Sequence, residues 1–181
     1  MGSTTREEIN LGAVTLAKLA RAYDVPTVVS TVGVDMGVNE GTIPELLAEL
    51  EGIEEIDRTG VNSWEDEDFR AAIRATGRRK IIMAGLWTEV CLTFPTLAML
   101  REGYEVYPVI DAVGGVSTVS HESAITRMVQ AGAHPTTSVA LGSEFMRNRA
   151  REDADAFRAI INDYFDRSRE LHGKGGNITD R

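Results

Sequence analysis

The stretch IIMAGLWTEVCLTFPTLAML, residues 81–100, carries the pattern that decides the fold. Its first five residues, 81–85, form a short apolar run that is typical of a buried parallel strand. From Cys91 to residue 102 the pattern becomes helical, and Gly103 marks the end of that helix. Cys91 is the only cysteine of the chain, so this strand-to-helix junction holds either a buried apolar filler or a nucleophile.

The same two patterns alternate along the rest of the chain. Short apolar or β-branched runs predict further strands at 26–32, 104–113 and 135–141. Helical spacing predicts helices at 7–23, 43–50, 63–77, 91–102 and 121–133. Ser63 is expected to be the N-cap of the helix at 63–77, and Gly77 to lie past its end. This alternation predicts a doubly wound, Rossmann-like three-layer α/β/α fold with a parallel sheet.

The length and composition suit one folded domain. The chain has 181 residues, of which 43% are hydrophobic and 26% charged, enough for a sizeable core. Residues 144–172 predict one or two closing helices, so we expect a single domain over residues 1–172 and a flexible tail at 173–181.

Charge and motif content exclude several classes of function. The net charge of −9 disfavours nucleic acid or an anionic membrane as a partner, because both are bound mainly by clustered Lys and Arg. The sequence has no nucleotide-binding glycine motif, no zinc-protease motif and no serine-hydrolase elbow, and its three histidines lack metal-ligand spacing. We therefore expect no cofactor and no metal. The absence of a signal segment, of a second cysteine and of an apolar run of roughly 18 residues predicts a soluble cytoplasmic protein.

The expected position of Cys91 favours the nucleophile. In an open α/β sheet, ligands bind beyond the carboxyl ends of the strands, and Cys91 follows such an end at the first turn of a helix. A helix N-terminus favours the thiolate, which is the form that attacks carbonyl carbons. It also offers unpaired backbone N–H groups that could stabilise an oxyanion.

Residues 58–115, RTGVNSWEDEDFRAAIRATGRRKIIMAGLWTEVCLTFPTLAMLREGYEVYPVIDAVGG, resemble the isochorismatase-like cysteine hydrolase superfamily. The resemblance is to a bacterial branch of oligomeric hydrolases of unknown substrate, and AGLWTEVC is its most specific part. It implies that this chain forms a homo-oligomer and acts on a small-molecule substrate. It implies that Cys91 is the nucleophile, that the bond between Leu86 and Trp87 is cis, and that the N–H groups of Trp87 and Cys91 hold the oxyanion. Trp64 and Trp87 are candidate walls of the substrate pocket, although packing is the commoner role of such a Trp.

Two catalytic residues of that family have no plain counterpart in this chain. The family carries an aspartate at the end of a first, central strand, whereas this chain begins with MGSTTREEIN and enters directly at the first helix. Asp111 ends a strand but matches a different family position, and the family's lysine position is matched by Arg58. Arginine can stabilise an anion but stays protonated and cannot shuttle protons. A sheet without its central strand must close the gap, recruit a neighbour's strand or leave backbone groups unpaired.

Three functional hypotheses remain open from the sequence. The first is a cysteine hydrolase that cleaves a C–N bond of a small amide through a thioester, impaired in a truncated form. The second is a catalytically silent homo-oligomeric assembly or binding protein of the same fold. The third is a thiol redox sensor, which the lack of a resolving cysteine disfavours.

Overall fold

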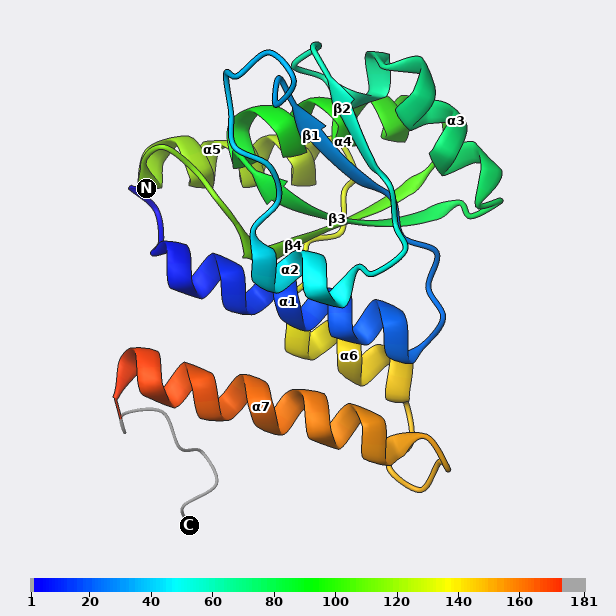
Figure 1. Cartoon of the computed structure of the whole chain (residues 1–181), viewed down its shortest axis with the longest axis vertical. Helices are drawn as coiled ribbons and strands as arrows, with labels where there is room; N and C mark the ends of the chain where they lie inside the picture. The colour runs from blue at the N-terminus through cyan, green and yellow to red at the C-terminus, as the bar shows by residue number, and fades with distance from the viewer. Residues whose placement is uncertain (1, 174–181) are drawn as a thin grey trace.

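The structure is a computed structural model that describes residues 2–173. Its strands are β1 (Val29–Val32), β2 (Glu55–Arg58), β3 (Lys80–Leu86) and β4 (Glu105–Gly114). Its α-helices are α1 (Arg6–Ala22), α2 (Pro44–Glu49), α3 (Glu67–Ala75), α4 (Thr93–Arg101), α5 (Thr118–Gln130), α6 (Ser138–Met146) and α7 (Ala154–His172). Two short turns of helix, η1 (Ser63–Glu65) and the π-type η2 (Thr88–Leu92), complete the described part, which Figure 1 shows.

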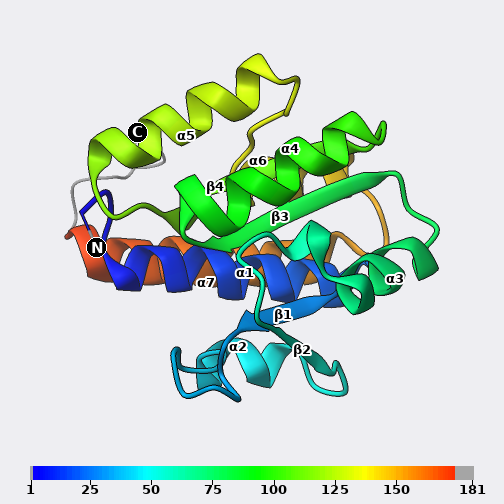
Figure 2. The same ribbon diagram turned by 90° about the horizontal axis from the view of Figure 1, so that it is seen from above.

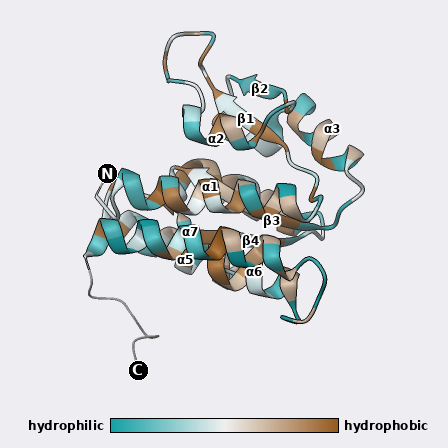
Figure 3. Ribbon diagram, turned by 60° about the horizontal axis from the view of Figure 1, so that its bottom comes forward, coloured by the Kyte–Doolittle hydropathy of each residue, from teal (hydrophilic) through white to brown (hydrophobic). Residues whose placement is uncertain are grey.

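Helices cover both faces of the sheet formed by β3 and β4. Figure 1 shows α4 and α5 on one side of these strands and α1 and α6 on the other, with α7 on the outer side of α1. The core follows the same division, with Leu92, Val113 and Met128 clustered on the α4 and α5 side. This confirms the predicted three-layer α/β/α class, to which α7 adds an outer helix. Figure 3 shows hydrophobic and hydrophilic residues alternating along α1 and α7, as expected of helices with one buried face.

Helix α1 lies unusually close to β4. Thr5 and Glu8 form a capping box that starts α1, since the Thr5 side chain accepts from the Glu8 N–H while the Glu8 carboxylate accepts from the Thr5 N–H. A Cβ atom on Gly12 would stand 2.2 Å from the carbonyl oxygen of Asp111, so only glycine allows this approach of helix to strand.

The parallel strands form two separate two-stranded sheets. β1 pairs with β2, and β3 pairs with β4, both in parallel register. The other edge of β4 is covered by a bridge from Val109 to Thr136. Among residues 2–173, no strand pairs with the free edge of β1 or with that of β3. Figure 2 shows these two strands running in the same direction, with α1 visible between them.

The two sheets show how the described residues arrange a sheet in which no central strand joins β1 to β3. Val28, just before β1, packs against the core cluster that contains Ile81 of β3, so the two sheets lie side by side. The second half of β3 is nevertheless exposed, with Leu86 41% accessible, although an apolar parallel strand is normally covered. Among residues 2–173, the carboxyl-terminal half of β3 is therefore left uncovered on its unpaired edge.

The structure corrects three local predictions. The strand expected at 135–141 is wrong, because α6 begins at Ser138 and only Thr136 joins the sheet. Ser63 lies inside η1, and Asp66 is the side chain that caps α3. β2 was not expected. The tail predicted at 173–181 lies, except for Gly173, outside the described residues.

Candidate active site

The junction after β3 has the form that the sequence predicts. β3 ends at Leu86, the bond from Leu86 to Trp87 is cis, and η2 then leads into α4. Cys91 lies in η2, neither sealed in the core nor fully exposed. A π-type turn is rare and is frequently found at functional sites, and here the backbone departs from a regular helix at Cys91.

The N–H of Trp87 is one of the two proposed oxyanion donors. The carbonyl of Trp87 accepts hydrogen bonds from the N–H groups of Val90 and Leu92, at 3.1 and 3.2 Å, which fixes the first turn. The N–H of Trp87 donates to no acceptor within residues 2–173. The Trp87 residue is 37% exposed, so its ring stands beside the junction rather than in the core.

A set of side-chain contacts anchors this turn to the segment after β4. Thr88 is fully buried, and its hydroxyl lies 2.9 Å from Nδ1 of His121 on α5. The carbonyl of Thr88 accepts the hydroxyl of Thr93 at 2.6 Å. Glu89 accepts the N–H of Val116 at 3.0 Å, which ties the same turn to the loop before α5. Sequence reasoning missed these contacts.

Arg58 lies at the end of β2, in the other sheet. It is only 5% exposed, and its guanidinium donates to the Ser30 hydroxyl and to the carbonyls of Gly60 and Val61. Within residues 2–173, neither a salt bridge to Arg58 nor a hydrogen bond from it to Cys91 is present. The two proposed catalytic residues are therefore not joined by a hydrogen bond among the described residues, and they belong to or follow strands of different sheets.

Asp57, next to Arg58, organises the loop after β1. Its carboxylate accepts the N–H groups of Asp35 and Val34, at 3.0 and 3.2 Å, and the hydroxyl of Thr31 at 2.8 Å. The Asp35 N–H is the largest cause that holds the pKa of Asp57 below its usual range. This carboxylate is thus committed to the loop that follows β1.

Trp64 and Asp111 have structural surroundings. Trp64 is 3% exposed, stacks edge-on against Tyr104 with ring centroids 5.2 Å apart, and donates its indole N–H to Glu102 at 2.8 Å. Packing alone explains this residue. Asp111 accepts the N–H of Ser138 at 2.9 Å and its hydroxyl at 3.0 Å, so its carboxylate caps α6 on the face of the sheet that α1 covers.

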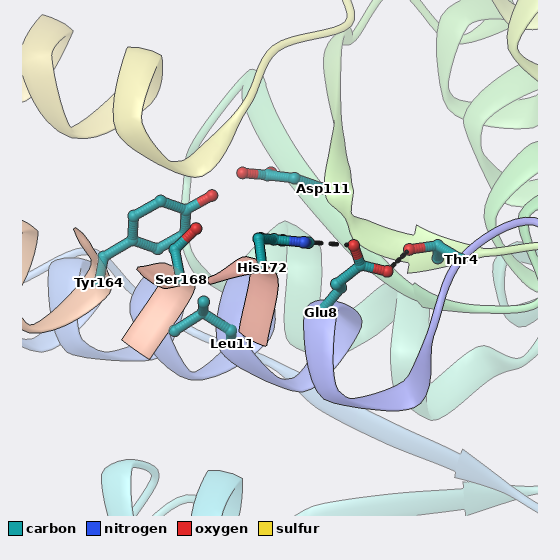
Figure 4. Close-up of a pocket in the computed structure, with 7 residues that line it drawn as sticks. All are labelled: Thr4, Glu8, Leu11, Asp111, Tyr164, Ser168 and His172. Carbon is teal, nitrogen blue, oxygen red and sulfur yellow. Dashed lines mark hydrogen bonds and ion pairs between the residues drawn. The ribbon is translucent and has the colours of Figure 1, made fainter. Parts of the chain in front are cut away.

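A polar cavity of about 150 Å³ lies on that same face, away from Cys91. It is lined by Thr4, Glu8, Leu11, Asp111, Tyr164, Ser168 and His172. Figure 4 shows the Tyr164 hydroxyl directed toward Asp111, and His172 directed toward Glu8. Nε2 of His172 lies 3.4 Å from Oε1 of Glu8. Hydrogen bonds from Thr4 and Thr5 lower the pKa of Glu8 to about 2. Burial, followed by the charge of Asp111, raises the pKa of Tyr164.

Metal ligands do not converge in the described part of the chain, where no three His, Cys, Asp or Glu side chains are grouped so as to hold an ion. A larger cavity of about 380 Å³ lies between α1 and α2 and is likewise not lined by Cys91. None of the helices within residues 2–173 is long and apolar enough to cross a membrane.

Fold and site together define an α/β protein with a cysteine at the carboxyl edge of a parallel sheet. The chain belongs to the isochorismatase family, whose Isochorismatase domain model matches residues 2–140. It is 35% identical over 157 residues to the "Probable hydrolase YcaC" of Escherichia coli strain K12, covering 86% of this chain and 74% of that protein.

Two solved structures are similar over most of their length. YcaC from Pseudomonas aeruginosa, solved with hexane-2,5-diol and covalent acrylamide, has a TM-score of 0.86 at 34% identity, covering 96% of this chain and 86% of that one. E. coli YcaC, described as an octameric hydrolase of unknown specificity, has a TM-score of 0.82 at 33% identity, covering 94% and 85%. These relatives confirm membership of a family of hydrolases with this fold.

Proposed function

We propose that this protein is a cysteine-dependent hydrolase that cleaves a C–N bond of a small amide through a thioester, with Cys91 as nucleophile. The observation that carries the proposal is the position of Cys91, partly exposed in the first turn after β3 and three residues beyond the buried anchor Thr88. The unpaired N–H of Trp87 at the same turn supports an oxyanion site.

The reaction would run in two halves. The Cys91 thiolate attacks the amide carbon, a C–S bond forms, and the carbonyl electron pair moves to an oxygen stabilised by the N–H groups of Trp87 and Cys91. The tetrahedral intermediate collapses, the C–N bond breaks, and the amine leaves after taking a proton. Water then hydrolyses the thioester, which releases the carboxylic acid and restores the thiol.

Proton transfer is the weak step of this scheme. Within residues 2–173, no carboxylate or histidine forms a hydrogen bond with Cys91, and the Arg58 guanidinium donates to the carbonyls of Gly60 and Val61 in the loop after β2. A positioned general acid typically contributes about 10²- to 10⁴-fold to such a step. We therefore expect alkylation at Cys91 together with slow amide turnover in the 181-residue chain.

Acrylamide is a suitable probe for this proposal. It alkylates thiolates, and the P. aeruginosa relative has been solved with covalent acrylamide. Mass spectrometry of the intact protein should show one adduct, because Cys91 is the only cysteine, and none in Cys91→Ser. Ammonia release from a panel of small amides, with Cys91→Ser as background, tests the hydrolysis. Equal release by both forms for every amide would contradict the assignment.

The second candidate is a catalytically silent assembly protein. The lack of a hydrogen bond between Arg58 and Cys91 within residues 2–173 favours it, as does the octameric E. coli relative. Four exposed apolar residues lie in loops that follow the strands, namely Met36, Val38, Val61 and Val116, and exposed Val119 lies in the first turn of α5. A second copy of the chain would cover such residues, so homo-oligomerisation accompanies either function. Native mass spectrometry tests it, and a monomeric mass would contradict it.

A further inference from the structure

We propose that His121 is a positioning residue for Cys91, acting through Thr88 together with Glu89. The inference rests on the proposed role of Cys91 as nucleophile. The three side chains belong to two elements, η2 and α5, that are joined only through the whole of α4 and β4 in the sequence.

Thr88 is the direct link between His121 and the turn that carries Cys91. It is the first residue of η2, and its side chain is fully buried. A buried hydroxyl left without a partner costs the full desolvation penalty of the group, so Thr88 depends on the ring nitrogen of His121 that lies 2.9 Å away. The Thr88 carbonyl is taken by Thr93, which fixes the residue from its other side as well.

Glu89 forms the second attachment of the same turn. One carboxylate oxygen accepts the N–H of Val116, whereas the other is shielded from solvent and has no hydrogen-bond partner among the described residues. A Cβ atom on Gly115 would stand 2.9 Å from this unpartnered oxygen and 2.9 Å from the Cβ of His121. Glu89 and His121 therefore border one small space that only glycine at position 115 leaves open.

The contacts of Thr88 and Glu89 together restrain η2 more than either contact would alone. Thr88 is held to α5, and Glu89 to the loop before α5, so the backbone between Trp87 and Cys91 has a fixed orientation relative to β4. The N–H groups proposed to hold the oxyanion belong to this backbone. Hydrogen-bond donors stabilise the developing oxyanion most when their positions are fixed before the reaction. Losing the restraint on this backbone should therefore slow attack by the thiolate.

The test is the second-order rate constant for alkylation of Cys91 by acrylamide, measured by intact mass across a range of pH. His121→Ala should lower this rate constant about fivefold, the factor that one buried hydrogen bond supplies. His121→Asn should stay within about twofold of the unmodified chain, because the Asn amide can offer either a donor or an acceptor near the place of Nδ1. His134→Ala, at an exposed histidine, is the matched control and should change nothing.

Two further variants separate positioning from a general loss of folding. Thr88→Val should lower the rate constant as His121→Ala does, and the double variant should fall no further, because both remove the same contact. Gly115→Ala should give a similar loss by displacing Glu89 and His121. Circular dichroism establishes which variants are folded, and Gly115→Ala and His121→Asn decide the outcome if His121→Ala is not.

Defined results would overturn the proposal. An unchanged or raised rate in folded His121→Ala, an equal loss in His121→Asn, or additive losses in the double variant would each exclude positioning through Thr88. Amide turnover is measured separately. If no variant hydrolyses any amide while the alkylation series follows the expected order, the hydrolase proposal fails and the positioning of Cys91 stands.

Discussion

A strand joined ahead of residue 2 should extend the sheet of the described residues and bring an acid close to Cys91. The change is a segment of five or six Val and Ile residues ending in aspartate, joined ahead of residue 2. Ser3 and Gly115 exchange hydrogen bonds at the carboxyl end of β4, so a strand leading into residue 2 would run parallel to β3 and end at the edge where Cys91 lies. The structure leaves the free edges of β1 and β3 available to it.

The expected magnitude has two parts. Successive N–H groups of a strand point to opposite sides, so about half of the amides of β1 and β3 face the gap and should gain protection from hydrogen exchange. The aspartate would supply an acid for the leaving amine, and amide turnover should rise by about 10²-fold or more. The same segment ending in asparagine is the matched control, which should restore protection without turnover. Protection of β1 and β3 without any rise in turnover for the aspartate form would refute the reasoning about proton transfer.

Three other expectations concern stability and assembly. The pKa of Glu8 falls from 4.5 to about 2 on folding, so its stabilising effect is present above pH 4.5 and is lost as the pH falls toward 2. Glu8→Gln should therefore lower the melting temperature at pH 6 and reduce its fall between pH 4.5 and 2. Gly12→Ala forces a Cβ against the backbone of Asp111, a cost of about 1–3 kcal/mol that exceeds the ~1 kcal/mol gained from helix propensity. Calorimetry should show a lower melting temperature, whereas Gly142→Ala, which meets only side chains, should cost less. Sedimentation should show that Trp64→Phe, a core change, has the same mass in solution as the unmodified chain, and a smaller mass would contradict the packing role.

The sequence predicts the elements whose local pattern agrees with their tertiary role. The run at 81–85 is apolar because β3 is a strand covered by helices, and the helical periodicity after Cys91 corresponds to α4. The run PTTSVAL misleads because Thr137 accepts the N–H of Ala140 and Asp111 caps the same helix start, so a β-branched segment opens α6. β2 is missed because EIDR is mostly charged, as suits a short strand that its neighbours cover only in part.

The candidate site also combines features that the sequence predicts with a contact that it does not predict. Cys91 and the cis bond follow from a local motif, and both could be found from AGLWTEVC. The contact of Thr88 with His121 joins residues 33 positions apart, and no spacing rule links a helix-start histidine to a buried threonine. Its only signal in the sequence is Gly115, whose missing side chain leaves room for Glu89 and His121 to approach.

The choice between hydrolase and silent assembly depends on what occupies the gap between the two sheets. Cys91 follows β3, and Arg58 ends β2, beyond β1 on the far side of that gap. A parallel strand that paired with the free edges of β1 and β3 would have its carboxyl end at the same edge as theirs. Such a strand, ending in aspartate, would place an acid at the edge that carries Cys91. With the gap open, Thr88, Glu89 and His121 still hold Cys91 in place, so thiol reactivity and amide turnover should separate experimentally.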